Sequence, residues 1–398
     1  MESTARDSDS STELQTRRRG DADSVRVLRP RRAAPADAVR PTRAEVNLAA
    51  LRHNLRVIAR HAGRAKVWPV LKADGYGHGA PAVARTLERA GAEGFCVALL
   101  EEAVELRDAG VRTPILVMGG YYGGAYEEIV ARNLVPVVYD ASHLEGIARA
   151  ARQAGHQVDV HLKIDTGMAR LGVRPGDVAA FARSIPSEVR VAGLMTHLAC
   201  AESDDGYTGD QLARFEEATA TLAQHGIQPG VRHAANSAAV LRGQALYDAV
   251  RPGIAIFGVS PTGAPMAELR AAMRVRSEIV DLRTIEPGES VGYGATFRAT
   301  RTTRIATVPM GYADGLSRNL SNRGHVLVGG VRAPIVGTVS MDMCMIDVTD
   351  VPGVDLHDEV TILGGSVAAE EIAASAGSIA WEVLTSISRR VPRFYREP

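Results

Sequence analysis

The chain has 398 residues, of which 45% are hydrophobic and 23% charged, which is sufficient for two globular domains with sizeable cores. Its 46 Lys and Arg residues balance 46 Asp and Glu residues, so charge favours neither nucleic acid nor a membrane surface as a partner. No apolar run approaches the ~18 residues of a membrane-spanning helix. Cys96, Cys200 and Cys344 are far apart and lack metal-ligand spacing, which predicts reduced thiols in a cytoplasmic protein.

Residues 1 to 40 differ in composition from the rest of the chain. They are rich in Ser, Asp and Arg and contain no aromatic residue, so they are predicted to be a disordered extension. The arginine cluster at residues 17 to 19 is a feature of some export signals, but no apolar stretch follows it. A secreted or membrane-anchored protein is therefore not expected.

From about residue 41 to residue 272, short apolar runs alternate with segments of helical periodicity, the pattern of a parallel sheet built from βα units. Eight runs can be counted, which favours a closed (β/α)8 barrel of the TIM type over an open sheet. The expected strands are residues 67–71, 95–99, 115–118, 135–139, 158–164, 191–196, 231–235 and 248–251. The clearest helical segments are residues 82–90, 101–109, 144–154 and 211–225.

In residues 273 to 398 the helical periodicity largely disappears, and short β-branched runs are separated by glycine-containing turns. Strands are expected at residues 276–284, 304–308, 325–328, 333–339, 343–348 and 359–363, and helices at residues 367–376 and 381–387. The predicted fold class is therefore α/β, with an N-terminal barrel and a C-terminal, mainly β domain.

Lysine is rare in this chain, because only Lys66, Lys72 and Lys163 occur among the 46 basic residues. Lys72 ends an apolar run and precedes a glycine-rich loop, where an ordinary loop cation remains an alternative to a reactive amine. A guanidinium group stays protonated at physiological pH, whereas an amine with a lowered pKa can act as a nucleophile or a base. Lys72 is therefore the candidate reactive group.

In a (β/α)8 barrel, reactive groups project from the carboxyl ends of the strands. The unusual polar residues that follow the predicted strands are Lys72, Lys163, Arg170, His197, Asn236, Ser237 and Arg251. Ser237 and Gly253 also begin segments with free backbone N–H groups, which are either simple caps or a phosphate site of the kind that barrels often carry after their last strands. An amine that faces a phosphate site suggests pyridoxal phosphate held as an imine on Lys72.

From about residue 41 to its end, the chain resembles the alanine racemases, which carry pyridoxal phosphate in a (β/α)8 barrel followed by a β domain. The matching motifs are residues 70–79 (VLKADGYGHG), 163–172 (KIDTGMARLG), 196–197 (TH), 235–237 (ANS), 251–254 (RPGI), 292–296 (GYGAT), 311–315 (GYADG) and 340–342 (SMD). The resemblance implies a homodimer with active sites at its interface. It also implies a small amino-acid substrate and interconversion of L- and D-alanine, with D-alanine supplied for peptidoglycan.

The resemblance implies two catalytic bases, because inverting an α-carbon removes a proton from one face and returns one to the other. Lys72, which would also carry the cofactor, is expected to be one base, and Tyr293 of the partner subunit the other. Arg251 would contact the pyridine nitrogen without readily giving it a proton. His197 would bridge Arg251 to Tyr293.

The same resemblance assigns the remaining positions. Arg170 is expected at the cofactor's phenolic oxygen and, together with Met341 of the partner subunit, at the substrate carboxylate. Lys163 aligns with a lysine that is carbamylated in some members. Tyr312, again from the partner, would line the substrate access channel, and Asp342 would lie at that channel. The expected phosphate ligands are Tyr76, Ser237, Gly253 and Ile254, with Asn236 behind them.

The chain departs from the family pattern at Arg389, where a tyrosine commonly precedes Arg-Val-Pro-Arg. An arginine there can pair with phosphate but forms no aromatic wall, which suggests relaxed selectivity that includes serine. A fold-related amino-acid decarboxylase is a weaker alternative, because Arg251 stands where that class has an acid. A noncatalytic pyridoxal phosphate carrier would need no second base. His78, Asp165 and Asp314 lie in matching motifs, but the residues indicate no role for them.

Overall fold

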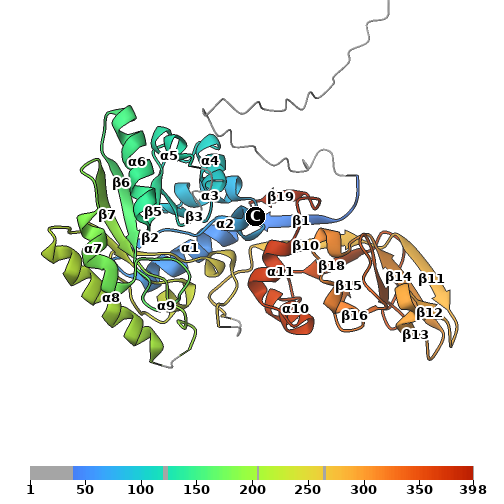
Figure 1. Ribbon diagram of the computed structural model, residues 1–398. Helices are drawn as coiled ribbons and strands as arrows, with labels where there is room; N and C mark the ends of the chain where they lie inside the picture. Colours follow the sequence, from blue (N-terminus) through green and yellow to red (C-terminus); the bar gives the residue numbers. More distant parts are fainter. Residues whose placement is uncertain (1–38, 120–123, 204–205, 263–265, 398) are drawn as a thin grey trace, which may run out of the picture.

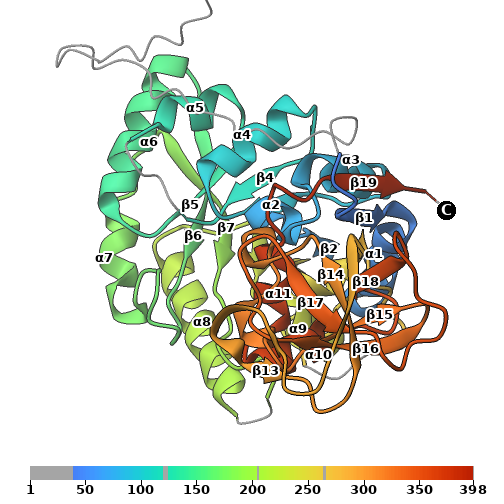
Figure 2. The same cartoon turned by 90° about the vertical axis from the view of Figure 1, so that its right-hand side faces the viewer.

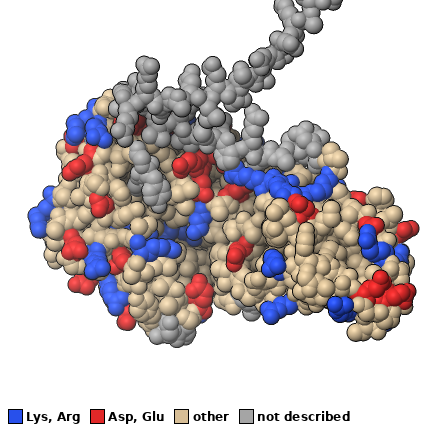
Figure 3. Space-filling view, turned by 45° about the vertical axis from the view of Figure 1, so that its right-hand side comes forward, with Lys and Arg blue, Asp and Glu red and all other residues tan. Residues whose placement is uncertain are grey.

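The computed structural model describes residues 39–119, 124–203, 206–262 and 266–397. They form a barrel and a β domain that lie side by side (Figure 1). The predicted disorder of residues 1 to 40 lies outside the described residues except for the last two. On the face drawn in Figure 3, basic and acidic side chains are interspersed, in line with the balanced charge of the sequence. In the described ranges, no helix has both the length and the apolar character needed to cross a membrane.

Eight parallel strands form the barrel wall, in the hydrogen-bonded order β2-β9-β8-β7-β6-β5-β4-β3. A parallel bridge between Val70 and Cys96 joins the segment after β2 to β3 and closes the ring. The strands are β2 (Lys66–Val67), β3 (Phe95–Val97), β4 (Ile115–Val117), β5 (Val135–Val138), β6 (Val158–Lys163), β7 (Val189–Met195), β8 (Val231–His233) and β9 (Ala249–Val250). The predicted (β/α)8 barrel is confirmed, with a last strand of only two residues.

Helices surround the barrel wall (Figure 2). The side chain of Asn47 accepts a hydrogen bond from the backbone N–H of Ala50 at the start of α1, and Asp140 caps α6 in the same way. The helices are α1 (Leu48–Ala62), α2 (Lys72–Tyr76), α3 (Ala80–Arg89), α4 (Leu100–Asp108), α5 (Tyr126–Ala131), α6 (Ala141–Ala154), α7 (Val178–Arg183), α8 (Tyr207–Gln224) and α9 (Ser237–Leu241), with short 3-10 turns η2 (Pro175–Asp177) and η3 (Ile254–Phe257). The four helical segments that the sequence predicts correspond to α3, α4, α6 and α8.

The β domain is built on a nine-stranded sheet in the order β11-β14-β17-β16-β15-β18-β10-β1-β19, beside a two-stranded hairpin, β12-β13. Its elements after the barrel are β10 (Met273–Glu278), β11 (Asp281–Ile285), β12 (Ser290–Val291), η4 (Tyr293–Ala295), β13 (Phe297–Arg298), β14 (Thr303–Val308), η5 (Tyr312–Asp314), η6 (Arg318–Leu320), β15 (His325–Val328), β16 (Val331–Val336), β17 (Cys344–Asp347), β18 (Glu359–Leu363), α10 (Ala369–Ala376), α11 (Ala380–Ser386) and β19 (Arg393–Arg396). The strand predicted at residues 276–284 is two strands, because β10 pairs with β18 whereas β11 pairs with β14. The sequence pattern did not predict β12, β13 or β19.

The first described strand, β1 (Arg43–Asn47), belongs to the β domain although the barrel follows it in sequence. It pairs antiparallel with β10 and parallel with β19, so strands from the two ends of the described chain are neighbours. Glu45 on β1 accepts hydrogen bonds from Arg276 and Arg396 on these two strands. The expected range of the barrel, residues 41–272, therefore contains one strand that the β-domain sheet uses.

The barrel and the β domain meet beside the loop that carries Lys72. One hydrophobic core cluster contains residues of both parts, from Ala44 to Val391. A Cβ atom on Gly77 would lie only 2.4 Å from the carbonyl oxygen of Leu384 in α11. Gly77 also has a φ of +79°, so both the close approach and the backbone conformation require glycine. The β domain therefore packs directly against the Lys72 loop at the barrel mouth of its own chain.

Candidate active site

Lys72 directly precedes a left-handed turn in the backbone. Ala73, Asp74, Gly75 and Tyr76 have φ values of 52°, 58°, 60° and 51°. For residues other than glycine, this conformation costs about 1–2 kcal/mol each, so the turn is strained at three positions. Strain of this kind persists only where surrounding contacts fix the backbone, and it is concentrated at functional sites.

Three contacts from different parts of the chain hold this turn. The backbone N–H of Ala73 donates to Glu102 Oε1 at 2.6 Å, and that of Ala80 donates to Asp74 Oδ1 at 2.8 Å. From the β domain, the buried Arg393 donates through Nε to the Gly77 carbonyl at 2.9 Å. The position of Lys72 therefore depends on α4, α3 and the C-terminal strand together.

Four cationic side chains lie at the barrel mouth, those of Lys72, Lys163, Arg170 and Arg251. Part of the Lys72 side chain is exposed there, but burial of its amine and the charge of Arg170 lower the pKa of Lys72. Burial, Arg170 and Arg251 lower the pKa of Lys163 to about 8. Burial and Arg251 lower the pKa of His197 to about 3, so this imidazole is neutral. Such a surplus of positive charge favours an anionic ligand, and it increases the fraction of neutral amine on both lysines.

The loop that carries Arg170 is shaped by Asp165, for which the sequence indicated no role. Asp165 Oδ1 accepts the backbone N–H groups of Gly167 and Ala169 at 3.1 and 3.0 Å. Ala169 has a φ of +54°, which turns the chain directly before Arg170. Asp165 therefore holds the loop after β6 in the conformation that presents Arg170 at the mouth.

Arg251 is seated in the barrel wall, with only 3% of its surface exposed. Its Nη1 atom donates to His233 Nδ1 at 2.6 Å and to the His233 carbonyl at 2.8 Å. Its Nη2 atom donates to the carbonyls of Thr196 and Ala234 at 2.7 and 3.2 Å. Within the described residues, these contacts use the four Nη hydrogens and leave the Nε–H as the remaining donor. Burial lowers the pKa of Arg251 to about 10, so it stays a cation at neutral pH.

A pair of buried histidines that the sequence analysis did not identify supports Arg251. His233 Nε2 lies 2.7 Å from His161 Nδ1, and Trp68 stacks on His161 with ring centroids 5.6 Å apart. Because Arg251 donates to Nδ1 of His233, the His233 proton is on Nε2 and is donated to His161. Burial and Arg251 lower the pKa of both histidines, which stay neutral. The pair therefore holds Arg251 in place and, being neutral, adds no positive charge beside it.

Most of the predicted phosphate ligands lie close together. Ser237 Oγ accepts the backbone N–H of Gly253 at 2.9 Å and that of Ala255 at 3.3 Å. A Cβ atom on Gly253 would lie 2.3 Å from the Tyr76 hydroxyl, so the ring approaches this backbone closely. Burial raises the pKa of Tyr76, which keeps its hydroxyl a hydrogen-bond donor. Ile254, which begins η3, is buried beside them.

Asn236 lies behind this cluster and has a local structural role. Its side-chain oxygen accepts the backbone N–H of Ala239 at 3.0 Å and caps the N-terminus of α9. This bond orients the first turn of α9, on which Ser237 stands. Asn236 thus places the Ser237 hydroxyl beside Gly253.

Three residues of the β domain with large side chains are predicted at the active site. They are exposed, and no described contact connects them with the barrel mouth of their own chain. Tyr293 is 75% exposed, Met341 53% and Tyr312 42%. Tyr293 lies between the two strands of the β12-β13 hairpin, at the end of the β domain away from the barrel (Figure 1). The described contacts do not connect Tyr293 with Lys72 in one chain.

The remaining predicted residues, Asp342 and Arg389, lie near the C-terminal segment. Asp342 accepts a hydrogen bond from Arg390 Nη2 at 2.7 Å. The Nη1 atom of Arg389 is buried and makes no hydrogen bond within the described residues. A buried guanidinium donor without a partner is costly unless an anion occupies the adjacent space, so Arg389 fits an anionic ligand.

Two family models match the chain in sequence. The N-terminal domain of alanine racemase matches residues 46–261, and the C-terminal domain of alanine racemase matches residues 272–395. The chain belongs to the alanine racemase family. The resemblance seen in the sequence motifs is therefore confirmed, and the family is one of amino-acid isomerases.

Individual relatives agree with this assignment. The chain is 61% identical to alanine racemase from Sorangium cellulosum over 378 residues, which cover 90% of this chain and 100% of that protein. A crystal structure of alanine racemase from D-cycloserine-producing Streptomyces lavendulae superimposes with a TM-score of 0.87 at 36% identity, covering 91% of this chain and 98% of that one. The structure from Bartonella henselae, described as having covalently bound pyridoxal phosphate, gives a TM-score of 0.82 at 30% identity over 89% and 99% of the two chains.

Proposed function

We propose that this protein interconverts L- and D-alanine as a homodimer, with pyridoxal phosphate attached covalently to Lys72. The observation that carries the proposal is the lysine itself, an amine whose pKa is lowered in a cationic barrel mouth. When bound, pyridoxal phosphate withdraws electrons from the substrate α-carbon and makes its proton removable. The chain's own residues then have to bind both molecules and move that proton.

The donors around Ser237 fit the phosphate group of this cofactor. The hydroxyls of Tyr76 and Ser237 and the backbone N–H of Ile254 are small donors that lie around Gly253, whose own N–H donates to Ser237 Oγ at 2.9 Å. Glycine at position 253 lets the Tyr76 hydroxyl approach the backbone, because a Cβ atom there would lie 2.3 Å from that hydroxyl. The unpartnered donor of Arg389 also fits an anion.

Arg251 is suited to hold the cofactor ring nitrogen through its Nε–H. Because Arg251 keeps its proton at neutral pH, it donates a hydrogen bond but does not protonate the nitrogen. A less electron-deficient ring favours return of the proton over side reactions such as transamination. This role also argues against a decarboxylase, in which an acid is expected at this position.

The two bases are assigned to opposite sides of the substrate. Lys72 supplies one from the barrel, and Tyr293 of the partner subunit supplies the other. The exposure of Tyr293, and the position of the β12-β13 hairpin at the end of the β domain away from the barrel (Figure 1), support a contribution in trans. His197 is neutral and lies close to Arg251. It is proposed to form a hydrogen bond with that phenol.

The substrate carboxylate is assigned to Arg170 and to Met341 of the partner subunit. Arg170 is exposed at the mouth and held by the loop that Asp165 shapes. Tyr312 and Asp342 of the partner are proposed to line the substrate access channel. Their exposure on the β domain supports contact with a second copy of the chain.

Spectroscopy of the purified protein tests this proposal. A visible absorbance band that borohydride removes, together with racemisation of L-alanine, is the expected result. Release of α-deuterium label from alanine into water distinguishes the racemase from a noncatalytic carrier, and carbon dioxide release would identify a decarboxylase. A colourless protein that does not take up added pyridoxal phosphate would contradict the assignment.

Replacing Arg389 tests substrate selectivity. We expect Arg389→Tyr to raise the ratio of kcat/KM for alanine over serine by about 10-fold, because an aromatic ring restores a rigid wall that a flexible arginine side chain does not form. The measurement compares racemisation of both amino acids by the wild type and the variant. Exposed Arg396, replaced by tyrosine in the same way, serves as the control. Equal selectivity in the wild type and Arg389→Tyr would remove the proposed role.

Lys163 is expected to be carbamylated. A pKa of about 8 leaves about a tenth of its amine neutral at pH 7, and the neutral amine is the form that attacks carbon dioxide. The N–C bond forms with loss of one proton, and the new carboxylate is stabilised by Arg170. With ¹³C-labelled bicarbonate, NMR should show one carbamate carbonyl signal that Lys163→Arg lacks. The same spectrum for both proteins would contradict this expectation.

A further inference from the structure

The turn η5 contains a buried carboxylate that lies between two guanidinium groups. Asp314 is 0% exposed. Arg40 donates to its two oxygens at 2.7 and 2.9 Å, and Arg390 Nε lies 3.3 Å from Oδ1. The backbone N–H of Gly311 completes the set at 3.1 Å. A buried carboxylate is stable only with such partners, so residues from both ends of the described chain meet at Asp314.

The same network reaches the loop that follows β16. Arg390, already in contact with Asp314, donates through Nη2 to Asp342 at 2.7 Å. The backbone N–H of Ala313 donates to the Met341 carbonyl at 3.0 Å. Side-chain charge and backbone hydrogen bonds therefore tie the 340–342 loop to η5.

Glycines at both ends of η5 allow neighbouring segments to approach closely. A Cβ atom on Gly311 would lie 2.3 Å from the Ser340 carbonyl oxygen. A Cβ atom on Gly315, which has a φ of +111°, would lie 2.5 Å from the Ser386 carbonyl oxygen. The motif at residues 311–315 is thus a tightly enclosed turn whose charged anchor is Asp314.

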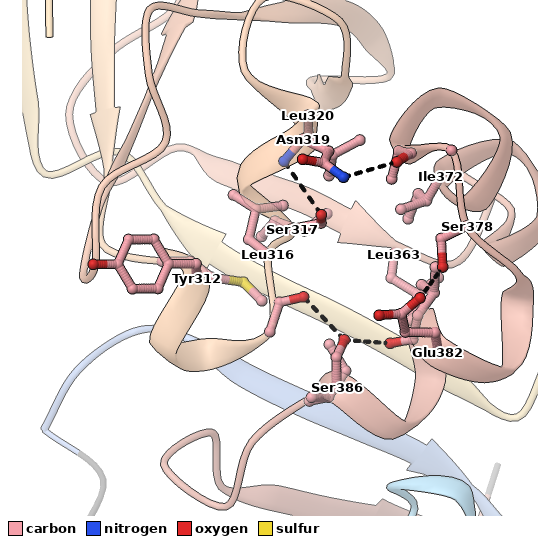
Figure 4. Close-up of a pocket in the computed structure, with 17 residues that line it drawn as sticks. Tyr312, Leu316, Ser317, Asn319, Leu320, Leu363, Ile372, Ser378, Glu382 and Ser386 are labelled. Atoms are coloured by element: carbon pink, nitrogen blue, oxygen red, sulfur yellow. Dashed lines mark hydrogen bonds between the residues drawn. The ribbon is translucent and has the colours of Figure 1, made fainter. Parts of the chain in front are cut away.

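One side of this turn faces a cavity of about 230 Å³ between η5, η6, β18, α10 and α11 (Figure 4). Its lining contains no residue of the barrel mouth, but it includes Tyr312, which is assigned to the partner's substrate path. In Figure 4 the Tyr312 ring projects away from α10 and α11. Side chains do not fill the space on this side, so η5 is held by its backbone hydrogen bonds to Ser340 and Met341 and by the ion pairs of Asp314.

We propose that Asp314 is a positioning residue for substrate access, holding η5 and the 340–342 loop in the geometry that the partner's active site requires. The inference rests on the proposed function, which assigns Tyr312, Met341 and Asp342 to the partner's substrate path. Arg40 joins the N-terminal segment to this arrangement. A residue outside the barrel mouth of its own chain thereby affects substrate access in the neighbouring one.

The variant Asp314→Asn in the full-length holoenzyme tests this role, because it keeps the side-chain size and removes the charge that both arginines share. We expect KM for alanine to rise at least about fivefold with kcat within about threefold of wild type, since substrate positioning is lost but the bases remain. Arg390→Gln should shift KM in the same direction. The cofactor absorbance should stay unchanged.

A matched control is Asp350→Asn, which breaks an exposed ion pair with Arg301 elsewhere in the β domain. It should leave KM unchanged. If Asp314→Asn lowers the melting temperature but keeps the wild-type KM, Asp314 is only a structural residue and the proposal is wrong.

Hybrid dimers provide a second test that is independent of stability. Co-expression of Asp314→Asn with Lys72→Ala under different tags yields dimers with one site that combines an intact Lys72 and an intact η5 turn. These hybrids should recover the wild-type KM at about half the wild-type kcat per dimer. A raised KM in the hybrid would overturn the positioning role in trans, whereas an inactive wild type would instead contradict the proposed function.

Discussion

Lys72→Ala is expected to fold but to lack covalently attached cofactor, and to lose about 10⁴-fold in kcat for both enantiomers of alanine. One amine is assigned two tasks, attachment of the cofactor and proton transfer on one face, so its removal affects every turnover. The side chain is partly exposed at the barrel mouth, so shortening it leaves no cavity in the core. Absorbance, mass spectrometry after borohydride treatment and a racemisation assay measure the three expected effects.

Lys66→Ala is the matched control for this experiment. Lys66 is exposed and begins β2, the strand that leads to Lys72, so it shares the local chain but not the barrel mouth. Its replacement should leave absorbance and activity at wild-type levels. If Lys72→Ala kept a borohydride-sensitive cofactor and measurable racemisation, the assignment of the reactive amine would be wrong.

Much of the barrel site was predictable because it depends on strand order. In a parallel barrel all carboxyl ends meet at one face, so residues that follow successive strands come together even when they are far apart in sequence. Ser237 and Gly253 illustrate this, since they follow β8 and β9 and are joined by a hydrogen bond of 2.9 Å. Lys72 was predictable for a chemical reason, because it is one of only three lysines in the sequence and follows an apolar strand.

Other features have no local signal in the sequence. β1 pairs with β10 and β19, which lie more than 200 residues away, and its own pattern does not reveal which sheet it joins. His161 and His233 occupy positions in barrel strands, where a histidine is usually a satisfied core residue. Their contact, and the tautomer that Arg251 imposes on His233, are visible only in the three-dimensional structure.

The left-handed turn after Lys72 was also not predictable in full. Gly75 and Gly77 indicate a bend, but Ala73 and Tyr76 adopt positive φ values that their residue types disfavour. Only contacts from α4 and the β domain explain why they do so. Long-range bonds therefore override local preference at the residue where the chemistry is proposed to occur.

Tyr293→Phe is expected to keep the bound cofactor but to lose proton exchange mainly from L-alanine, by about 10²–10⁴-fold. The change removes one hydroxyl from a side chain that is 75% exposed, so neither folding nor the barrel mouth of the same chain should respond. Incorporation of deuterium from heavy water into each enantiomer, followed separately by NMR, measures the asymmetry. Tyr395→Phe on β19 is the control and should exchange both enantiomers at wild-type rates.

Mixed dimers of Tyr293→Phe and Lys72→Ala decide whether the phenol acts across the interface. If Tyr293 serves the partner's barrel, each hybrid has one site with both bases intact and one with neither. Isolated hybrids should then racemise both enantiomers at about half the wild-type rate, although each parent homodimer is impaired. If Tyr293 acted within its own chain, each hybrid site would lack one base, so activity no higher than the mean of the two parents would contradict the division of labour between subunits.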